Sequence, residues 1–87
     1  MYKVLSAQAI RGQLVLGVEI QEPHDFGWRG RTIEVAENPD RRLTICGGRI
    51  VFDSEDRVTS RRILICDAID FPPNELIGQQ LRPSPLT

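Results

Sequence analysis

The sequence predicts a mainly all-β protein: a small antiparallel β-barrel or rolled sheet of about six strands, with a short C-terminal helix or extended arm. Apolar and polar residues alternate along several short segments, which is the period of a half-buried strand. Clusters of glycine, proline and asparagine separate these segments and are typical of turns. The chain has 87 residues, of which 40% are hydrophobic, which is enough for one modest core.

The first two strands are predicted as a hairpin. Residues 13–21, QLVLGVEIQ, alternate between apolar and polar side chains, and residues 2–9 are also strand-like. A two-residue turn at Arg11-Gly12 would join them, although arginine is a poor residue for a position with positive φ. This turn would place apolar residues opposite one another in three pairs: Ala9 with Leu14, Ala7 with Leu16, and Leu5 with Val18.

The middle of the chain is predicted as a three-stranded meander over Arg31–Glu37, Arg41–Cys46 and Arg49–Asp53. The intervening segments, Asn38-Pro39-Asp40 and Gly47-Gly48, are strong turn signals. Both turns place the same set of apolar side chains on one face, and a slip of one residue would mix that set with polar residues. The set comprises Ile33, Val35, Leu43, Ile45, Ile50 and Phe52.

A further strand is predicted over residues 61–68. Its centre, Ile63-Leu64-Ile65-Cys66, is apolar without alternation, so we expect it to be covered on both sides, inside a barrel or beneath another subunit. The prolines of Phe71-Pro72-Pro73 then end the strand.

The C-terminal region is predicted to hold a short helix over Glu75–Leu81, with Asn74 as its N-cap. We therefore expect one β-rich domain over residues 1–81 and a flexible tail over residues 82–87.

Eleven basic and twelve acidic residues give a net charge of −1, which excludes a strongly basic nucleic-acid arm and a disordered polyelectrolyte. No apolar run is long enough for a membrane span and no signal peptide begins the chain, so we expect a cytoplasmic protein of bacterial type with no membrane contact. The low net charge opposes self-association only weakly. We expect a homo-oligomer, with a dimer as the first expectation.

Cys46 and Cys66 both lie in apolar, strand-like runs and belong to no C-x-x-C motif. We expect two reduced, half-buried thiols that act as small hydrophobic residues. A cross-strand disulfide and a redox thiol are the alternatives.

The segment 22–30 is the longest predicted connection, and it contains the only tryptophan and the only histidine of the chain. Tryptophan and arginine are enriched at binding hot spots, so we interpret the segment as a partner-binding loop. The alternative is that Phe26 and Trp28 fold back and close one end of a barrel. The candidate partner-binding residues are His24, Phe26, Trp28, Arg29 and Arg31.

Catalytic, metal and cofactor sites are not predicted. Asp25 follows His24 directly, and adjacent side chains of an extended chain point apart, so Asp25 is poorly placed to orient that imidazole. Glu22, His24 and Asp25 form a weak metal-binding pattern because a second histidine is missing.

Five arginines provide an alternative nucleic-acid interface, because they could form a basic stripe on one side of the sheet. Acidic residues lie among them and the aromatic residues lie in other segments, so a solvated, charge-paired face is the simpler interpretation. The five are Arg41, Arg42, Arg57, Arg61 and Arg62.

Three functions therefore follow from the sequence. The first is a non-enzymatic interaction module, an accessory or regulatory protein that binds a protein partner through the 22–30 loop and self-associates. The second is a small β-barrel that binds nucleic acid through the arginine face. The third is a small-ligand binder or enzyme with a pocket at the Phe26–Trp28 loop.

Overall fold

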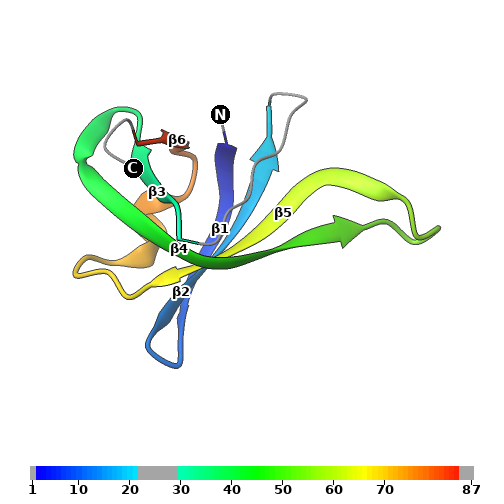
Figure 1. Cartoon of the computed structure of the whole chain (residues 1–87), viewed down its shortest axis with the longest axis horizontal. Helices are drawn as coiled ribbons and strands as arrows, with labels where there is room; N and C mark the ends of the chain where they lie inside the picture. Colours follow the sequence, from blue (N-terminus) through cyan, green and yellow to red (C-terminus); the bar gives the residue numbers. More distant parts are fainter. Residues whose placement is uncertain (1, 22–29, 85–87) are drawn as a thin grey trace.

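The chain folds into a closed antiparallel barrel of six strands, which confirms the predicted fold class. The computed structural model describes residues 2–21 and 30–84. Around the barrel the strands follow the order β1-β2-β5-β4-β3-β6, and β6 pairs with β1 to close the ring (Figure 1). The elements are β1 (Tyr2–Ile10), β2 (Gln13–Ile20), β3 (Thr32–Val35), β4 (Asn38–Phe52), β5 (Val58–Asp67), the 3-10 helix η1 (Pro73–Leu76) and β6 (Gln80–Pro83).

The predicted β1–β2 hairpin is present, and its turn is formed by Arg11 and Gly12. Both residues have positive φ, 52° and 77°, as a type I′ turn requires, so arginine adopts the conformation that we expected it to resist. The pairs Ala9 with Leu14 and Ala7 with Leu16 form as predicted. Beyond them a bulge at Leu5 shifts the register, so Val4 rather than Leu5 lies opposite Val18.

Apolar side chains from every strand and from η1 fill the barrel. Along β2, Leu14, Leu16 and Val18 alternate with more exposed residues and point inward. Burial of each such side chain contributes about 1.5–3 kcal/mol relative to its exposure. The core consists of Tyr2, Val4, Leu14, Leu16, Val18, Ile33, Val35, Leu43, Ile45, Leu64, Cys66, Leu76 and Leu81.

Gly47-Gly48 is not a turn. β4 continues through both glycines as one strand of 15 residues, and it pairs first with β3 and then with β5. The register shifts between Ile45 and Gly47, and glycine is common at such irregularities because it has no side chain to place. The predicted meander was therefore wrong here, and Ile50 and Phe52, which it assigned to the core, are 42% and 55% exposed.

The turn before β4 also differs from the prediction. Ala36 and Glu37 form it, whereas Asn38-Pro39-Asp40 is the first part of β4. The pairing is also irregular between Glu34 and Val35, and Ile33 lies opposite Leu43 instead of the predicted Ile45. This is a shift of two residues, which keeps every side chain on its face. Four residues of the predicted apolar face are buried as expected: Ile33, Val35, Leu43 and Ile45.

β5 is the central strand of the region, because it pairs with β2 on one side and with β4 on the other. Leu64 and Cys66 point into the barrel and are fully buried. Ile63 and Ile65 alternate with them and are half-buried. The non-alternating apolar run thus belongs to a strand that lies inside the closed sheet.

The C-terminal region is less helical and more extended than predicted. The helix is the short η1, and Gln80 begins β6, so residues 82 and 83, which we assigned to a tail, belong to the barrel. Hydrogen bonds tie the connection between η1 and β6 to Val4, which donates its N–H to Gln79 at 3.0 Å and accepts from the N–H of Gly78 at 2.8 Å. Across residues 2–21 and 30–84, no helix has the length and hydrophobicity needed to cross a bilayer.

Candidate interaction surface

A hairpin made by the end of β4 and the start of β5 extends beyond the barrel (Figure 1). We call residues 50–60 the projecting hairpin. The pairing of β2 with β5 ends at Glu19 and Arg61, and β3 pairs with β4 only as far as Thr44. Within the described chain, the projecting hairpin is therefore a two-stranded ribbon, a structure that is marginally stable by itself in water.

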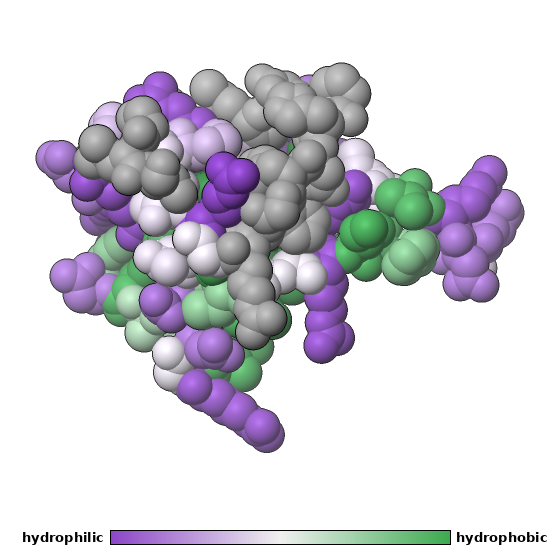
Figure 2. Space-filling model, viewed as in Figure 1, coloured by the Kyte–Doolittle hydropathy of each residue, from purple (hydrophilic) through white to green (hydrophobic). Residues whose placement is uncertain are grey.

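One face of the projecting hairpin is apolar. Ile50 and Phe52 are two residues apart on β4, so alternation along that strand places them on one face. Phe52 lies opposite Val58, and the pairing of β4 with β5 shifts register between Ile50 and Phe52. The side chains of Ile50, Phe52 and Val58 are 42%, 55% and 59% exposed, respectively. Figure 2 shows a hydrophobic patch on the projecting hairpin, between the barrel and the hydrophilic tip. Contiguous exposed apolar surface of this kind marks interaction sites.

The tip of the projecting hairpin is held by Asp53. Its carboxylate accepts hydrogen bonds from the N–H groups of Glu55 and Arg57, at 2.8 and 2.9 Å, and from the Arg57 Nε at 3.2 Å. Asp56 has a φ of 61°, a left-handed conformation that aspartate tolerates better than most residues. The tip is thus a defined turn built from local polar contacts.

The same contacts lower the pKa of Asp53. The largest cause is the hydrogen bond from the backbone of Arg57, followed by that from the backbone of Glu55. A carboxyl whose folded-state pKa is depressed stabilises the fold above its unfolded value of about 3.9 and loses that contribution as the pH falls through the folded value. The turn is therefore firm at neutral pH and loosens only in acid.

The base of the projecting hairpin is also fixed by hydrogen bonds. The Thr59 hydroxyl donates to the carbonyl of Val51 at 2.6 Å across the ribbon. The guanidinium of Arg62, which is 8% exposed, donates to the carbonyls of Thr59 and Arg61 at 2.6 and 2.8 Å. Both ends of the apolar face are therefore held, which lowers the ordering cost of binding.

Charge is distributed unevenly along the projecting hairpin and its base. The tip has Asp53, Glu55 and Asp56 against Arg57, a net charge of −2. The base has three arginines and one acidic residue, Glu19 of β2, which lies opposite Arg61, so its net charge is +2. The basic residues of the base are Arg49, Arg61 and Arg62.

Most of the predicted partner-binding loop lies outside the described residues. His24, Phe26, Trp28 and Arg29 belong to the part that is not described, as does the Phe26–Trp28 pocket. Arg31 is exposed, and its carbonyl accepts the N–H of Ile45 at 2.8 Å, while the N–H of Gly30 donates to the Ile45 carbonyl at 2.7 Å. The end of the predicted loop is thus anchored on β4 next to the point where β4 begins to pair with β5.

The five arginines of the alternative nucleic-acid interface are divided between the two ends of β4. Arg41 and Arg42 lie near its start, whereas Arg57, Arg61 and Arg62 belong to the projecting hairpin and its base. Arg57 forms ion pairs with Asp53 and Glu55, and Arg62 is buried. Arg42 and Arg61 are exposed.

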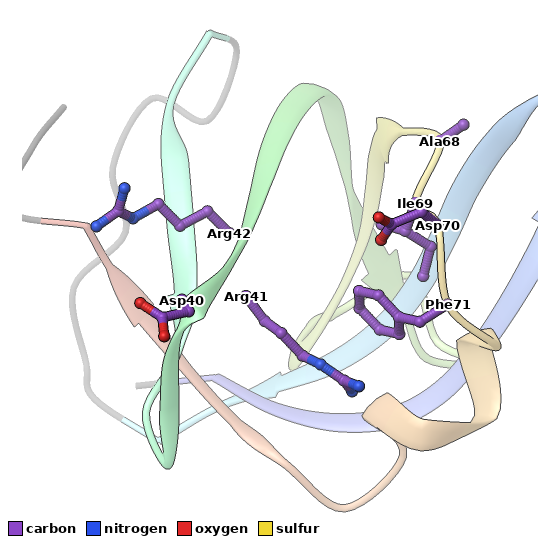
Figure 3. Close-up of a pocket in the computed structure, with 7 residues that line it drawn as sticks. All are labelled: Asp40, Arg41, Arg42, Ala68, Ile69, Asp70 and Phe71. Atoms are coloured by element: carbon purple, nitrogen blue, oxygen red, sulfur yellow. The ribbon is translucent and has the colours of Figure 1, made fainter.

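A groove of about 620 Å³ lies between the start of β4 and the connection that follows β5. In Figure 3 the Arg41 side chain reaches across it towards Phe71. The guanidinium carbon lies 4.0 Å from the centroid of the Phe71 ring, and the group pairs with Glu75 at 2.9 Å. Arg41 therefore links β4 to η1 and to the 68–72 connection, so these contacts give the groove a structural role.

Both cysteines are reduced thiols, as predicted, but only one of them is half-buried as expected, because Cys66 is fully buried in the core. Cys46 is half-buried, and its Sγ donates to Asp67 Oδ1 at 3.0 Å. Burial in the core, with smaller contributions from Cys46 and Asp67, raises the pKa of the Cys66 thiol to about 12. The Cys66 thiolate, which is the reactive form, is therefore scarce at neutral pH.

This difference predicts selective alkylation. In native protein at pH 8, iodoacetamide is expected to modify Cys46 first and to leave Cys66 protected until the protein unfolds, because Cys66 is both buried and protonated. Intact-mass spectrometry would show one adduct in buffer and two in guanidinium chloride. A Cys46→Ser variant serves as the control and should show none in buffer. Equal labelling of both cysteines in buffer would contradict the burial of Cys66.

The described residues contain no group of three or more histidine, cysteine, aspartate or glutamate side chains arranged to hold a metal ion. The fold and its surface together define a small closed β-barrel with a projecting apolar hairpin. Comparison with known proteins found no matching protein family, and no curated protein or solved structure matched significantly either.

Sequence reasoning missed the residues of this surface. Ile50 and Phe52 were assigned to the core, and Val58 was assigned no role. One signal was available: the polar run from Asp53 to Arg57 follows directly on the apolar Ile50–Phe52 segment, a pattern typical of a hairpin tip.

Proposed function

We propose that the protein is a non-enzymatic interaction module that binds a protein partner through the apolar face of the projecting hairpin. The observation that carries this proposal is the exposure of Ile50, Phe52 and Val58 on a ribbon that extends beyond the barrel. A ribbon with an open apolar face gains stability when another polypeptide covers it.

The order within the projecting hairpin supports the proposal. Asp53 fixes the tip and Thr59 ties the two strands together, so the apolar face is presented in one conformation. Preorganised surfaces bind more tightly because less conformational entropy is lost on association. Aromatic anchors such as Phe52 are also enriched at the centres of protein interfaces.

The broader expectations from the sequence complete the proposal. The protein acts as an accessory or regulatory factor of bacterial type in the cytoplasm, where its balanced charge suits a contact dominated by apolar side chains. Arg31 and Gly30 are anchored at Ile45, so the predicted 22–30 loop ends on the strand that continues into the projecting hairpin.

Site-specific photocrosslinking tests the proposal. We would place p-benzoylphenylalanine at position 52 and irradiate cells that make the protein. The matched control carries the same group at position 10, because Ile10 is 44% exposed but lies at the end of β1, next to the β1–β2 turn. The proposal predicts adducts with a polypeptide at position 52 that are absent at position 10. An equal yield at both positions, or no adduct at position 52, would overturn it.

A further inference from the structure

The charges of the projecting hairpin are arranged around its apolar centre in a self-complementary way. Phe52 and Val58 lie opposite one another and form the centre of the exposed apolar face. Glu55, at the tip, is three residues from each of them along the chain. Arg49 lies three residues before Phe52, and Arg61 lies three residues after Val58.

This spacing has a geometric consequence. Three residues of a strand cover about 10 Å, so Arg49 lies about that far before Phe52 on β4, whereas Glu55 lies in the turn beyond the Phe52–Val58 pair. Because side chains alternate along a strand, Arg49 points to the face opposite Phe52 and reaches the apolar side around the edge of the ribbon. A twofold axis that lies between two facing ribbons, level with the Phe52–Val58 pair and perpendicular to the strand direction, would exchange the two ends. The acidic tip of one copy would then face the basic base of another, while apolar side chains meet at the centre.

We propose that the partner covering the projecting hairpin is a second copy of this chain, packed antiparallel through the same apolar face. This inference rests on the proposed function, and it specifies both the partner and the geometry. Two symmetric contacts form, each between Glu55 of one protomer and Arg49 of the partner subunit, with Arg61 nearby. The chain's net charge of −1 leaves little repulsion between the two copies.

The exposure of the groups supports such contacts. Glu55 is 69% exposed, and its only described ion pair is with Arg57, whose side chain is itself 71% exposed. Arg49 is also exposed. It lies in the part of β4 beyond Thr44, where β3 no longer pairs with β4 and the edge of the strand is open. A two-stranded ribbon is narrow, and a long arginine side chain can reach around its edge to a facing carboxylate.

Charge reversal tests the antiparallel arrangement. Glu55→Arg removes the net negative charge of the tip and places a basic side chain where the contact needs an acidic one, and Arg49→Glu does the reverse at the base. Each variant alone is expected to raise the dimer dissociation constant about tenfold, since each reverses two symmetric contacts per dimer. An equimolar mixture of the two variants should form a heterodimer close to the wild type in affinity. In that heterodimer the substituted tip faces the substituted base, and the unchanged Glu55 faces the unchanged Arg49, so both contacts join opposite charges. Sedimentation equilibrium at low salt measures all three constants.

Arg11→Glu is the matched control, because it makes the same charge change at the exposed β1–β2 turn. It should leave the constant unchanged, and thermal unfolding should show that all variants remain folded. Failure of the mixture to recover affinity would overturn the antiparallel arrangement. A wild-type chain that stays monomeric would overturn the second copy as partner, whereas adducts at position 52 with a different polypeptide would still uphold the proposed function.

Discussion

Replacing Arg82 with leucine is expected to lower the free energy of unfolding by about 2–3 kcal/mol. Arg82 of β6 lies opposite Glu34 of β3, and its Nε and terminal nitrogen contact Glu34 Oε2 at 3.0 and 2.9 Å. The Glu34 side chain is only 4% exposed, whereas that of Arg82 is 42% exposed. Removal of the guanidinium leaves a nearly buried carboxylate without this partner, which costs more than the loss of an exposed ion pair.

The double variant Glu34→Leu/Arg82→Leu separates this cause from lost packing. If the buried carboxylate dominates, the second substitution should recover more than half of the lost stability, because the two positions are coupled. Urea denaturation of the wild type, both single variants and the double variant supplies the complete cycle. A loss below about 0.5 kcal/mol for Arg82→Leu, the usual size for a surface substitution, would show that the ion pair does not hold β6 against β3.

For the proposed dimer, replacing Phe52 with serine is expected to raise the dissociation constant by 100-fold or more. A central aromatic anchor contributes about 2 kcal/mol or more to an interface, and the twofold axis removes it from both sides at once. The fold should remain intact, because the Phe52 side chain is already 55% exposed and lies outside the core cluster. Light scattering would report the dissociation, and thermal unfolding would report the preserved barrel.

Ile10→Ser is the control for general hydrophobicity, since Ile10 is 44% exposed on a different part of the barrel. It should leave the dimer intact. A dimer that tolerates Phe52→Ser but dissociates with Ile10→Ser would place the contact at the β1–β2 end of the molecule.

The local signals in the sequence predicted the barrel well where they concern neighbouring residues. The Arg11-Gly12 turn and the alternation of β2 set the first hairpin, and only the bulge at Leu5 altered its register. The inward-facing residues of β3 and early β4 were predicted correctly although the turn between these strands was assigned wrongly. The observed register differs from the predicted one by two residues, and the side-chain period of a strand is two.

Gly47-Gly48 misled the prediction for a physical reason. Glycine suits both a tight turn and a bulge within a continuous strand, so the residue type cannot distinguish them. Whether the two glycines form a turn or a bulge depends on which strand pairs with the residues that follow them. In this fold those residues pair with β5 and do not fold back on the first part of β4, and such pairing is a long-range property. The error hid the candidate site, because a turn at the glycines would have folded Ile50 and Phe52 back onto the core.

The barrel closure was also beyond local reasoning. Arg82 and Pro83 are followed by Ser84 and Pro85 in a proline-rich segment that is typical of an extended tail. Their place in β6 depends on Glu34 and on the backbone of β3, which lie about fifty residues earlier in the chain. Sequence patterns show that the segment is extended but not which strand it joins.

The most direct test of the account is the solution mass of the purified chain, measured by light scattering over a range of concentrations. The account predicts that the wild type approaches twice the 9.8 kDa mass of one chain as concentration rises, while Phe52→Ser stays near 9.8 kDa at the same concentrations. A wild-type mass of 9.8 kDa at every concentration, or a dimer that Phe52→Ser leaves intact, would contradict it.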